Sequence, residues 1–160
     1  MTLKFRNVAI SPDRPVSEWP GEAVLTALER GSLCDWRRLA RAVQQEPWGP
    51  TARRIEQALG VRRPYGIAPA MEAVLAAARQ QQVERERRAV AQQVRQLIAA
   101  SRLKQSEFAA GIGTSRSRLS TYATGKVVPS AAMLVRMQQF ARRCRDRHAD
   151  PAAAPNRETR

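Results

Sequence analysis

The stretch at residues 104–130, KQSEFAAGIGTSRSRLSTYATGKVVPS, decides the fold that this part of the 160-residue chain can adopt. Residues 105–111 are enough for two helical turns with an apolar inner side. Gly113 then provides a sharp turn, and Ser115 is placed to cap a second short helix over residues 116–123. The stretch therefore predicts two short helices that are joined by a tight turn.

The residues that follow predict where the second helix ends and the next one begins. Gly125 ends the second helix, Pro129 breaks the chain, and Ser130 caps a further helix. The apolar residues of that further helix recur at helical spacing and are Met133, Leu134, Met137 and Phe140. Two short helices around a glycine turn make a helix-turn-helix, whose second helix can enter a DNA major groove.

This part of the chain resembles the helix-turn-helix family of the lambda repressor and Cro, often called the XRE family. The family pattern falls without a gap on Gln105, Phe108, Ala109, Gly113, Ser115, Leu119, Ser120, Tyr122, Gly125, Pro129 and Ser130. The resemblance extends over about residues 90–143. Two positions depart from the pattern: Gly111 replaces a helix former, which predicts fraying, and Ala123 replaces a common Glu, which predicts a missing helix-terminal interaction.

The resemblance implies a role for individual positions of this sequence. Gln105 would contact a phosphate and brace the second helix. The residues expected to face base edges are Arg116, Ser117 and Thr121. The residues expected near the DNA backbone are Arg118, Ser120 and Thr124, with Ser115 as the cap that positions the helix. Arginine can donate two hydrogen bonds to O6 and N7 of guanine, so Arg116 is the expected principal specificity contact.

The distribution of charge agrees with this interpretation. The chain has 28 Lys and Arg against 14 Asp and Glu, a net charge of +14 that attracts nucleic acid, anionic lipid and acidic protein alike. Residues 94–144 contain nine basic residues and one acidic residue, a net charge of +8. Three basic residues flank the two helices and suit phosphate neutralisation: Arg102, Lys104 and Lys126.

The N-terminal part of the chain predicts three short amphipathic helices. These helices are expected at residues 20–30, 34–45 and 50–59, where apolar residues recur every three or four positions. Three tryptophans lie between or beside them and are expected to anchor a core: Trp19, Trp36 and Trp48. The sequence therefore predicts a helical module over residues 1–66.

A long helix is predicted at residues 68–101, which are rich in Ala, Glu, Gln and Arg. Both ends of this stretch are apolar, whereas its middle, QQQVERERR at residues 80–88, is polar. A polar middle indicates a solvated connector over residues 67–89. A dimeric coiled coil is the alternative, although only Val83 and Ala89 would fill its seam in this part.

The sequence favours no enzyme, metal or membrane function. No run of 18 apolar residues and no apolar signal core occur, so we expect a cytoplasmic protein that is nucleoid-associated when bound to DNA. Cys34 and Cys144 are isolated, and no His lies at ligand spacing, so no metal site and no cofactor are predicted. His148 stands alone in a charged stretch, and no catalytic residues are predicted.

We therefore expect an all-α protein with an N-terminal three-helix module, a long connecting helix and a lambda-repressor-like helix-turn-helix domain. The expected parts are residues 1–66, 67–89 and 90–146, followed by a disordered tail over residues 147–160. The expected function is sequence-specific binding of double-stranded DNA by a homodimeric transcription regulator, most simply a repressor, that reads the major groove with residues 116–123.

Two alternatives concern the N-terminal module. In an antitoxin, that module would bind a partner toxin while the helix-turn-helix regulates its own operon. In an enzyme or a small-ligand sensor, the same module would hold the ligand.

Overall fold

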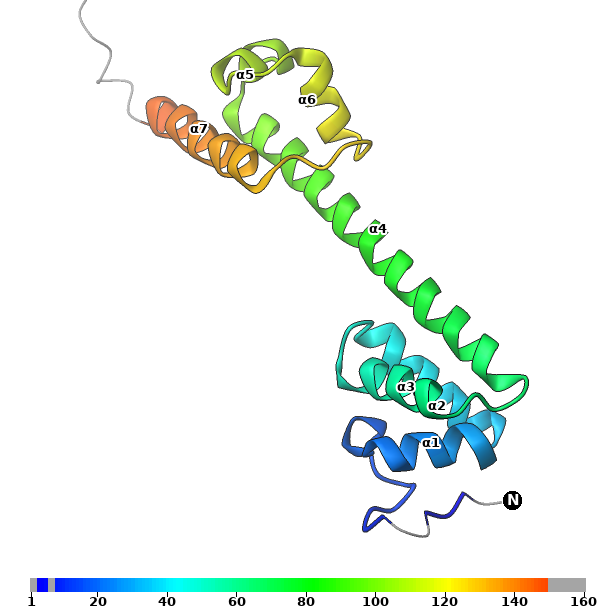
Figure 1. Cartoon of the computed structure of the whole chain (residues 1–160). Coiled ribbons are helices and arrows are strands. Elements are labelled where there is room, and N and C mark those ends of the chain that lie inside the picture. Colours follow the sequence, from blue (N-terminus) through cyan, green and yellow to red (C-terminus); the bar gives the residue numbers. More distant parts are fainter. Residues whose placement is uncertain (1–2, 6–7, 150–160) are drawn as a thin grey trace, which may run out of the picture. The chain divides into compact units, whose positions relative to one another are not determined.

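The computed structural model describes residues 3–5 and 8–149, and all regular structure in these residues is helical (Figure 1). Seven α-helices and one short 3-10 helix follow one another in this part, without a strand. The predicted all-helical class is confirmed. The chain divides into two compact units, Met1–Val83 and Glu84–Arg160. None of the described helices is both long and apolar enough to cross a bilayer.

The N-terminal unit contains the three predicted helices and the beginning of a fourth. Its elements are η1 (Val16–Glu18), α1 (Gly21–Arg30), α2 (Leu33–Gln45), α3 (Pro50–Val61) and the first turns of α4 (Ile67–Ser101). The largest fully buried side chains of its core are Trp19, Leu28, Leu39, Ile55 and Met71. Met71 comes from α4, so the beginning of the long helix completes a core that three helices of 10 to 13 residues leave open.

Local sequence signals explain where these helices begin. The carboxylate of Asp35 accepts hydrogen bonds from the backbone N–H and the hydroxyl of Ser32, at 2.9 and 2.8 Å, which caps α2. Pro50 stands in the first turn of α3, where its missing N–H needs no replacement. Pro69 lies in the first turn of α4, so this helix continues unbroken for 35 residues.

The three tryptophans do not share one role. Trp19 is fully buried, its indole N–H donates to the carbonyl of Arg14 at 3.1 Å, and the ring of Phe5 meets it edge-on at 5.2 Å. Trp36 is half-buried and packs against the same core. Trp48 keeps 48% of its surface exposed in the loop before α3. The expectation of a core anchor is therefore wrong for Trp48.

The C-terminal unit contains the end of α4 and three further helices. These are α5 (Gln105–Gly111), α6 (Arg116–Ala123) and α7 (Ala131–Ala149), which confirms the predicted short helices at 105–111 and 116–123. The core between them contains the buried side chains of Val94, Phe108, Ile112, Leu119 and Met137. Burying each of these side chains contributes about 1.5–3 kcal/mol.

The last helix extends further than the sequence predicts. Residues 147–149, assigned above to a tail, are the last three residues of α7. Pro151 disfavours a helical conformation only for the residue directly before it, so the helix can continue as far as Ala149. The remainder of the predicted disordered tail, residues 150–160, lies outside the described residues.

Candidate nucleic-acid interface

A tight turn between α5 and α6 directs the second short helix away from the first. Gly113 has a φ of 73°, in the left-handed region that a residue without Cβ adopts at little cost. Its N–H donates to the carbonyl of Ala110 at 3.1 Å, and the N–H of Thr114 donates to the carbonyl of Ala109 at 2.9 Å. These bonds satisfy the last carbonyls of α5 and fix the turn.

The helix α6 packs against the core of its unit with one face and is capped at its N-terminus. The hydroxyl oxygen of Ser115 accepts a hydrogen bond from the backbone N–H of Arg118 at 3.1 Å. Leu119 and Tyr122 are buried in the core of the unit. Because these two residues are three positions apart, they fix one face of α6 to the core and leave the opposite face to the solvent.

The exposed residues of α6 include two arginines and two serines. Arg116, Ser117 and Ser120 are exposed. Arg118 lies along the helix, because its Nε donates to the hydroxyl oxygen of Tyr122 at 2.9 Å. Thr121 is half-buried and its hydroxyl donates to the carbonyl of Arg118 at 2.7 Å, which leaves its methyl group and oxygen lone pairs available.

Two arginines outside α6 hold the ends of the short helices. Nη1 of Arg95, on α4, donates to the carbonyl of Ala123, the last residue of α6, at 2.6 Å. Nη1 of Arg136, on α7, donates to the carbonyl of Ile112 in the turn at 3.3 Å. The expectation that Ala123 leaves a helix-terminal interaction unmade is therefore wrong, since Arg95 bonds the backbone where a Glu side chain is common.

The second departure from the family pattern also has a structural reason. A Cβ on Gly111 would collide with the ring of Phe140, which packs edge-on against Phe108 with ring centroids 5.3 Å apart. Gly111 is the last residue of α5, and the helix keeps its full predicted length. The glycine therefore provides room for the aromatic pair, and α5 still extends to Gly111.

Residues 94–141 match the family described as helix-turn-helix. This segment is a helix-turn-helix domain. The match begins near the end of α4, ends within α7 and includes both α5 and α6. The predicted resemblance to the lambda repressor and Cro is confirmed for this segment, and with it a domain that binds double-stranded DNA. Comparison with curated proteins and with solved structures gave no match.

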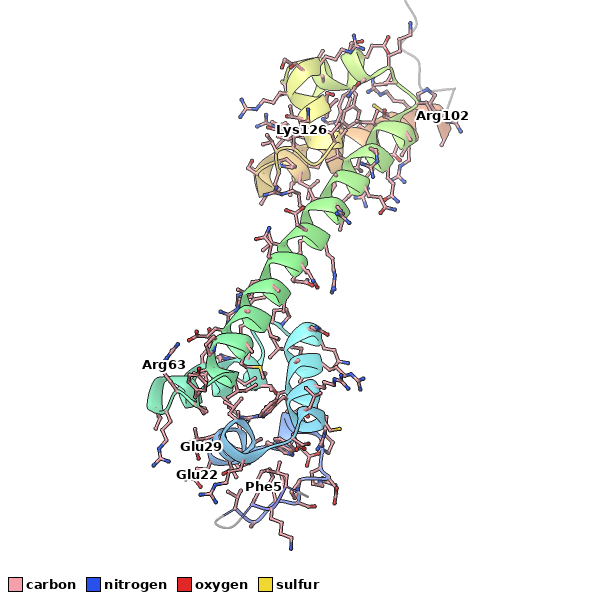
Figure 2. All side chains as sticks on the ribbon, turned by 90° about the vertical axis from the view of Figure 1, so that its right-hand side faces the viewer. Phe5, Glu22, Glu29, Arg63, Arg102 and Lys126 are labelled. Atoms are coloured by element: carbon pink, nitrogen blue, oxygen red, sulfur yellow. The ribbon has the colours of Figure 1, made fainter. Side chains whose placement is uncertain are left out.

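The residues outside α6 that are predicted to contact the DNA backbone lie at or before the start of α5 and after α6. Lys104 and Gln105 begin α5, with Lys104 exposed and Gln105 half-buried, while Thr124 and Lys126 follow α6 and are exposed. Arg102, at the end of α4, instead lines a hollow of about 430 Å³ together with Arg145 and His148 of α7. Figure 2 shows Arg102 at the end of α4 and Lys126 in the segment that follows α6.

The basic side chains of the helix-turn-helix domain are not neutralised by acidic partners among the described residues. Among the described residues from 94 onward, no basic side chain forms a salt bridge. The one carboxylate within 94–144, that of Glu107, accepts the backbone N–H of Lys104 at 2.8 Å and caps α5. The guanidinium and ammonium groups therefore keep their charge available for phosphates.

Sequence patterns did not reveal the bracing roles of Arg95 and Arg136. Both residues contribute to the positive charge of the segment, but their hydrogen-bond partners lie 28 and 24 residues away along the chain. One local signal is that Arg95 directly follows the buried Val94 on α4, which places it at the edge of the packed face.

Proposed function

We propose that this protein is a transcription regulator that binds a specific double-stranded DNA sequence and represses transcription by covering a promoter. The observation that carries the proposal is the placement of α6. Its inner side is fixed by the buried Leu119 and Tyr122, while Arg116 and Ser117 at its N-terminal end are exposed. Recognition helices of this type contact base edges with their N-terminal residues.

Each of the three proposed base-reading side chains of α6 matches a chemical partner on DNA. The side chain of Arg116 has no hydrogen bond or ion pair with any described residue, so its guanidinium is free to donate to O6 and N7 of a guanine. Ser117 can donate to or accept from a neighbouring base. The methyl group of Thr121 suits the methyl group of thymine.

We propose that other residues of the same domain contact the DNA backbone beside the three residues that read bases. Arg118 keeps its two Nη groups available while its Nε is bonded to Tyr122. The proposed phosphate and positioning residues are Arg102, Lys104, Gln105, Ser115, Arg118, Ser120, Thr124 and Lys126. These contacts set affinity and register, whereas the base contacts set sequence preference.

We further propose that the regulator binds as a homodimer. Two copies of α6 that lie about 34 Å apart would read the same face of the DNA one helical turn apart. The operator would then consist of two related half-sites in inverted orientation.

Selection from a random duplex library, at a stated salt concentration, tests the proposal directly. The expected result is an enriched site with two inverted half-sites. Arg116→Ala should weaken binding to that site by about 1–3 kcal/mol and should remove the preference at one position of each half-site. An in vitro transcription assay with the selected site inside a promoter should show less transcript when the protein is added.

The matched control is Arg142→Ala, which removes from α7 one exposed charge that has no partner among the described residues. This variant should keep the wild-type sequence preference. An Arg116→Ala protein with an unchanged preference would overturn the assignment of Arg116. Binding that is salt-sensitive and selects no sequence at all would overturn the proposal of specific regulation.

A further inference from the structure

An apolar groove lies on the N-terminal unit, between α2 and the beginning of α4. It has a volume of about 470 Å³. From α2 the groove is lined by Leu33, Trp36, Arg37 and Ala40, which follow the spacing i, i+3, i+4 and i+7. The helix α4 repeats the same spacing between Ile67 and Val74. Each of the two helices thus presents a row of residues at helical spacing to one groove, which a third amphipathic helix can fill.

The walls of this groove are formed before any partner binds. The indole N–H of Trp36 donates to the carbonyl of Ala27 at 2.9 Å, which fixes the ring on the core side of α2. Leu33 keeps 56% of its surface exposed, and Tyr65 is fully exposed just before α4. Tryptophan and tyrosine are among the residue types that dominate the energy of protein interfaces, and the exposed leucine adds apolar surface beside them.

The charge along the groove is positive and unneutralised. Arg37 lines the groove and Arg41 follows it one helical turn later, and neither has an ion pair or hydrogen-bond partner among the described residues. The carboxylates of α2 and of the first turns of α4 are already engaged. Asp35 accepts from Ser32, and Glu72 pairs with Arg63 (labelled in Figure 2) at 2.6 Å.

We propose that this groove binds an acidic amphipathic helix of another protein. The apolar face of that helix would lie between α2 and α4, and its carboxylates would pair with Arg37 and Arg41. A second copy of the chain fits less well, because two facing grooves would bring four guanidinium groups together without a free carboxylate. A small ligand also fits less well, since Arg37 is the single charged side chain among the described residues that line the groove, and the other free polar group there, the hydroxyl of Tyr65, belongs to a fully exposed side chain.

This proposal concerns the N-terminal unit and does not depend on which DNA sequence the helix-turn-helix domain recognises. It gives the protein a second partner, so that binding of an acidic helix and binding of an operator can be measured separately on the full chain.

Three synthetic peptides test the groove on the full-length protein. The first is a 20-residue peptide with Leu at i, i+3, i+4 and i+7 spacing and Glu elsewhere, the second has Lys in place of Glu, and the third is a scrambled form of the first. Fluorescence anisotropy is measured with excess duplex DNA present, so that the basic DNA-binding surface is occupied. The acidic amphipathic peptide should bind at least tenfold more tightly than either of the others.

Variants of the groove locate the binding. The double variant Arg37→Glu, Arg41→Glu should weaken binding of the acidic peptide at least tenfold and should strengthen binding of the Lys peptide. Ala70→Phe should block binding of both peptides, because the larger side chain fills the groove. The control is Arg53→Glu on α3, an exposed arginine without a side-chain partner among the described residues, which should leave peptide binding unchanged.

Nuclear magnetic resonance gives a second readout that does not depend on charge. The protein has three indole N–H signals, and only that of Trp36 should shift when the acidic peptide is added. Equal binding of the scrambled peptide, or an unshifted Trp36 signal, would overturn the proposal. A concentration-dependent self-association that Ala70→Phe abolishes would also overturn it, because the occupant would then be a second copy.

Discussion

Arg95 on α4 donates a hydrogen bond from Nη1 to the carbonyl oxygen of Ala123, 2.6 Å away, and so fixes the end of the candidate recognition helix. The last carbonyls of a helix have no partner within it, and a cation near them is favourable. In this chain a side chain from another helix supplies both the donor and the charge. The orientation of α6 therefore depends on α4 as well as on the turn before it.

Arg95→Ala should lower the stability of the helix-turn-helix domain by about 1 kcal/mol, because a hydrogen bond from a charged donor is lost at a helix end. DNA affinity should fall with it, since α6 is held less firmly. Amide hydrogen exchange measures the effect best, because α6 amides report on this unit alone. Arg88→Ala is the matched control, since Arg88 is exposed on the same helix and has no partner among the described residues. Equal exchange rates of α6 in the two variants would contradict the bracing role.

Gly111→Ala should destabilise the same domain, although alanine is the better helix former. The added Cβ would meet the ring of Phe140, and overpacking of this kind costs about 1–3 kcal/mol. Gly60→Ala in α3 is the matched control, because its Cβ would meet nothing within 4 Å and should stabilise by about 0.5–1 kcal/mol. Phe140→Leu should reduce the cost of Gly111→Ala. Denaturation followed by circular dichroism should show stability changes of opposite sign for Gly111→Ala and Gly60→Ala. A stabilising Gly111→Ala would refute the steric explanation.

The ion pair between Arg79 and Glu56 should make the N-terminal unit sensitive to acid. The hydrogen bond from Arg79, at 2.7 Å, lowers the pKa of Glu56 below its ordinary value of 4.5. A lowered pKa in the folded state stabilises the fold at pH values above 4.5, and this contribution is lost as the pH falls through the lowered pKa. Both side chains are partly exposed, so the contribution is at most about 0.5–1 kcal/mol.

Glu56→Gln therefore should lower stability near pH 7, and this loss should become smaller as the pH falls through the lowered pKa of Glu56. Tryptophan fluorescence in urea measures this selectively, because all three tryptophans lie in the N-terminal unit. Arg79→Ala should cost more than Glu56→Gln, since Nε of Arg79 also donates to the carbonyl of Pro47 at 3.1 Å. A Glu56→Gln effect that stays constant as the pH is lowered from 7 into the acid range would exclude the ion pair as its cause.

The sequence predicts the short helices well because their signals are local. Ser115 caps α6 within three residues of its partner, and Gly113 is needed at the turn by its own φ angle. The long helix is also predicted from composition, and its apolar beginning explains why Met71 reaches the N-terminal core. In each case the residues that determine a helix end or a turn lie within one or two helical turns of it along the chain.

The features that escape prediction depend on residues far apart in the chain. Gly111 is intelligible only with Phe140, which lies 29 positions later. The groove on the N-terminal unit is likewise formed by Leu33 and Val74, whose helices are separated by all of α3. Apolar spacing shows that each helix has an inner face, but it does not show which part of that face stays uncovered.

Arg102 combines a strained backbone with a proposed phosphate contact, and two substitutions separate these roles. Its φ of 58° lies in the left-handed region, which costs a residue with a Cβ about 1–2 kcal/mol. Arg102→Ala removes the charge and keeps the Cβ, whereas Arg102→Gly removes both. The glycine variant should therefore be more stable than the alanine variant by about 1 kcal/mol.

The two variants should nevertheless bind DNA alike, because both lack the cation. Log affinity falls as log salt concentration rises. If Arg102 neutralises one phosphate, the steepness of this decrease should be smaller by about 0.9 in both variants than in the wild type. Titrations of the selected operator at several salt concentrations measure this slope, and thermal unfolding of the same samples measures the stability difference. A wild-type slope in both variants would remove Arg102 from the phosphate contacts and would agree with its place beside Arg145 and His148, on the hollow between α4 and α7.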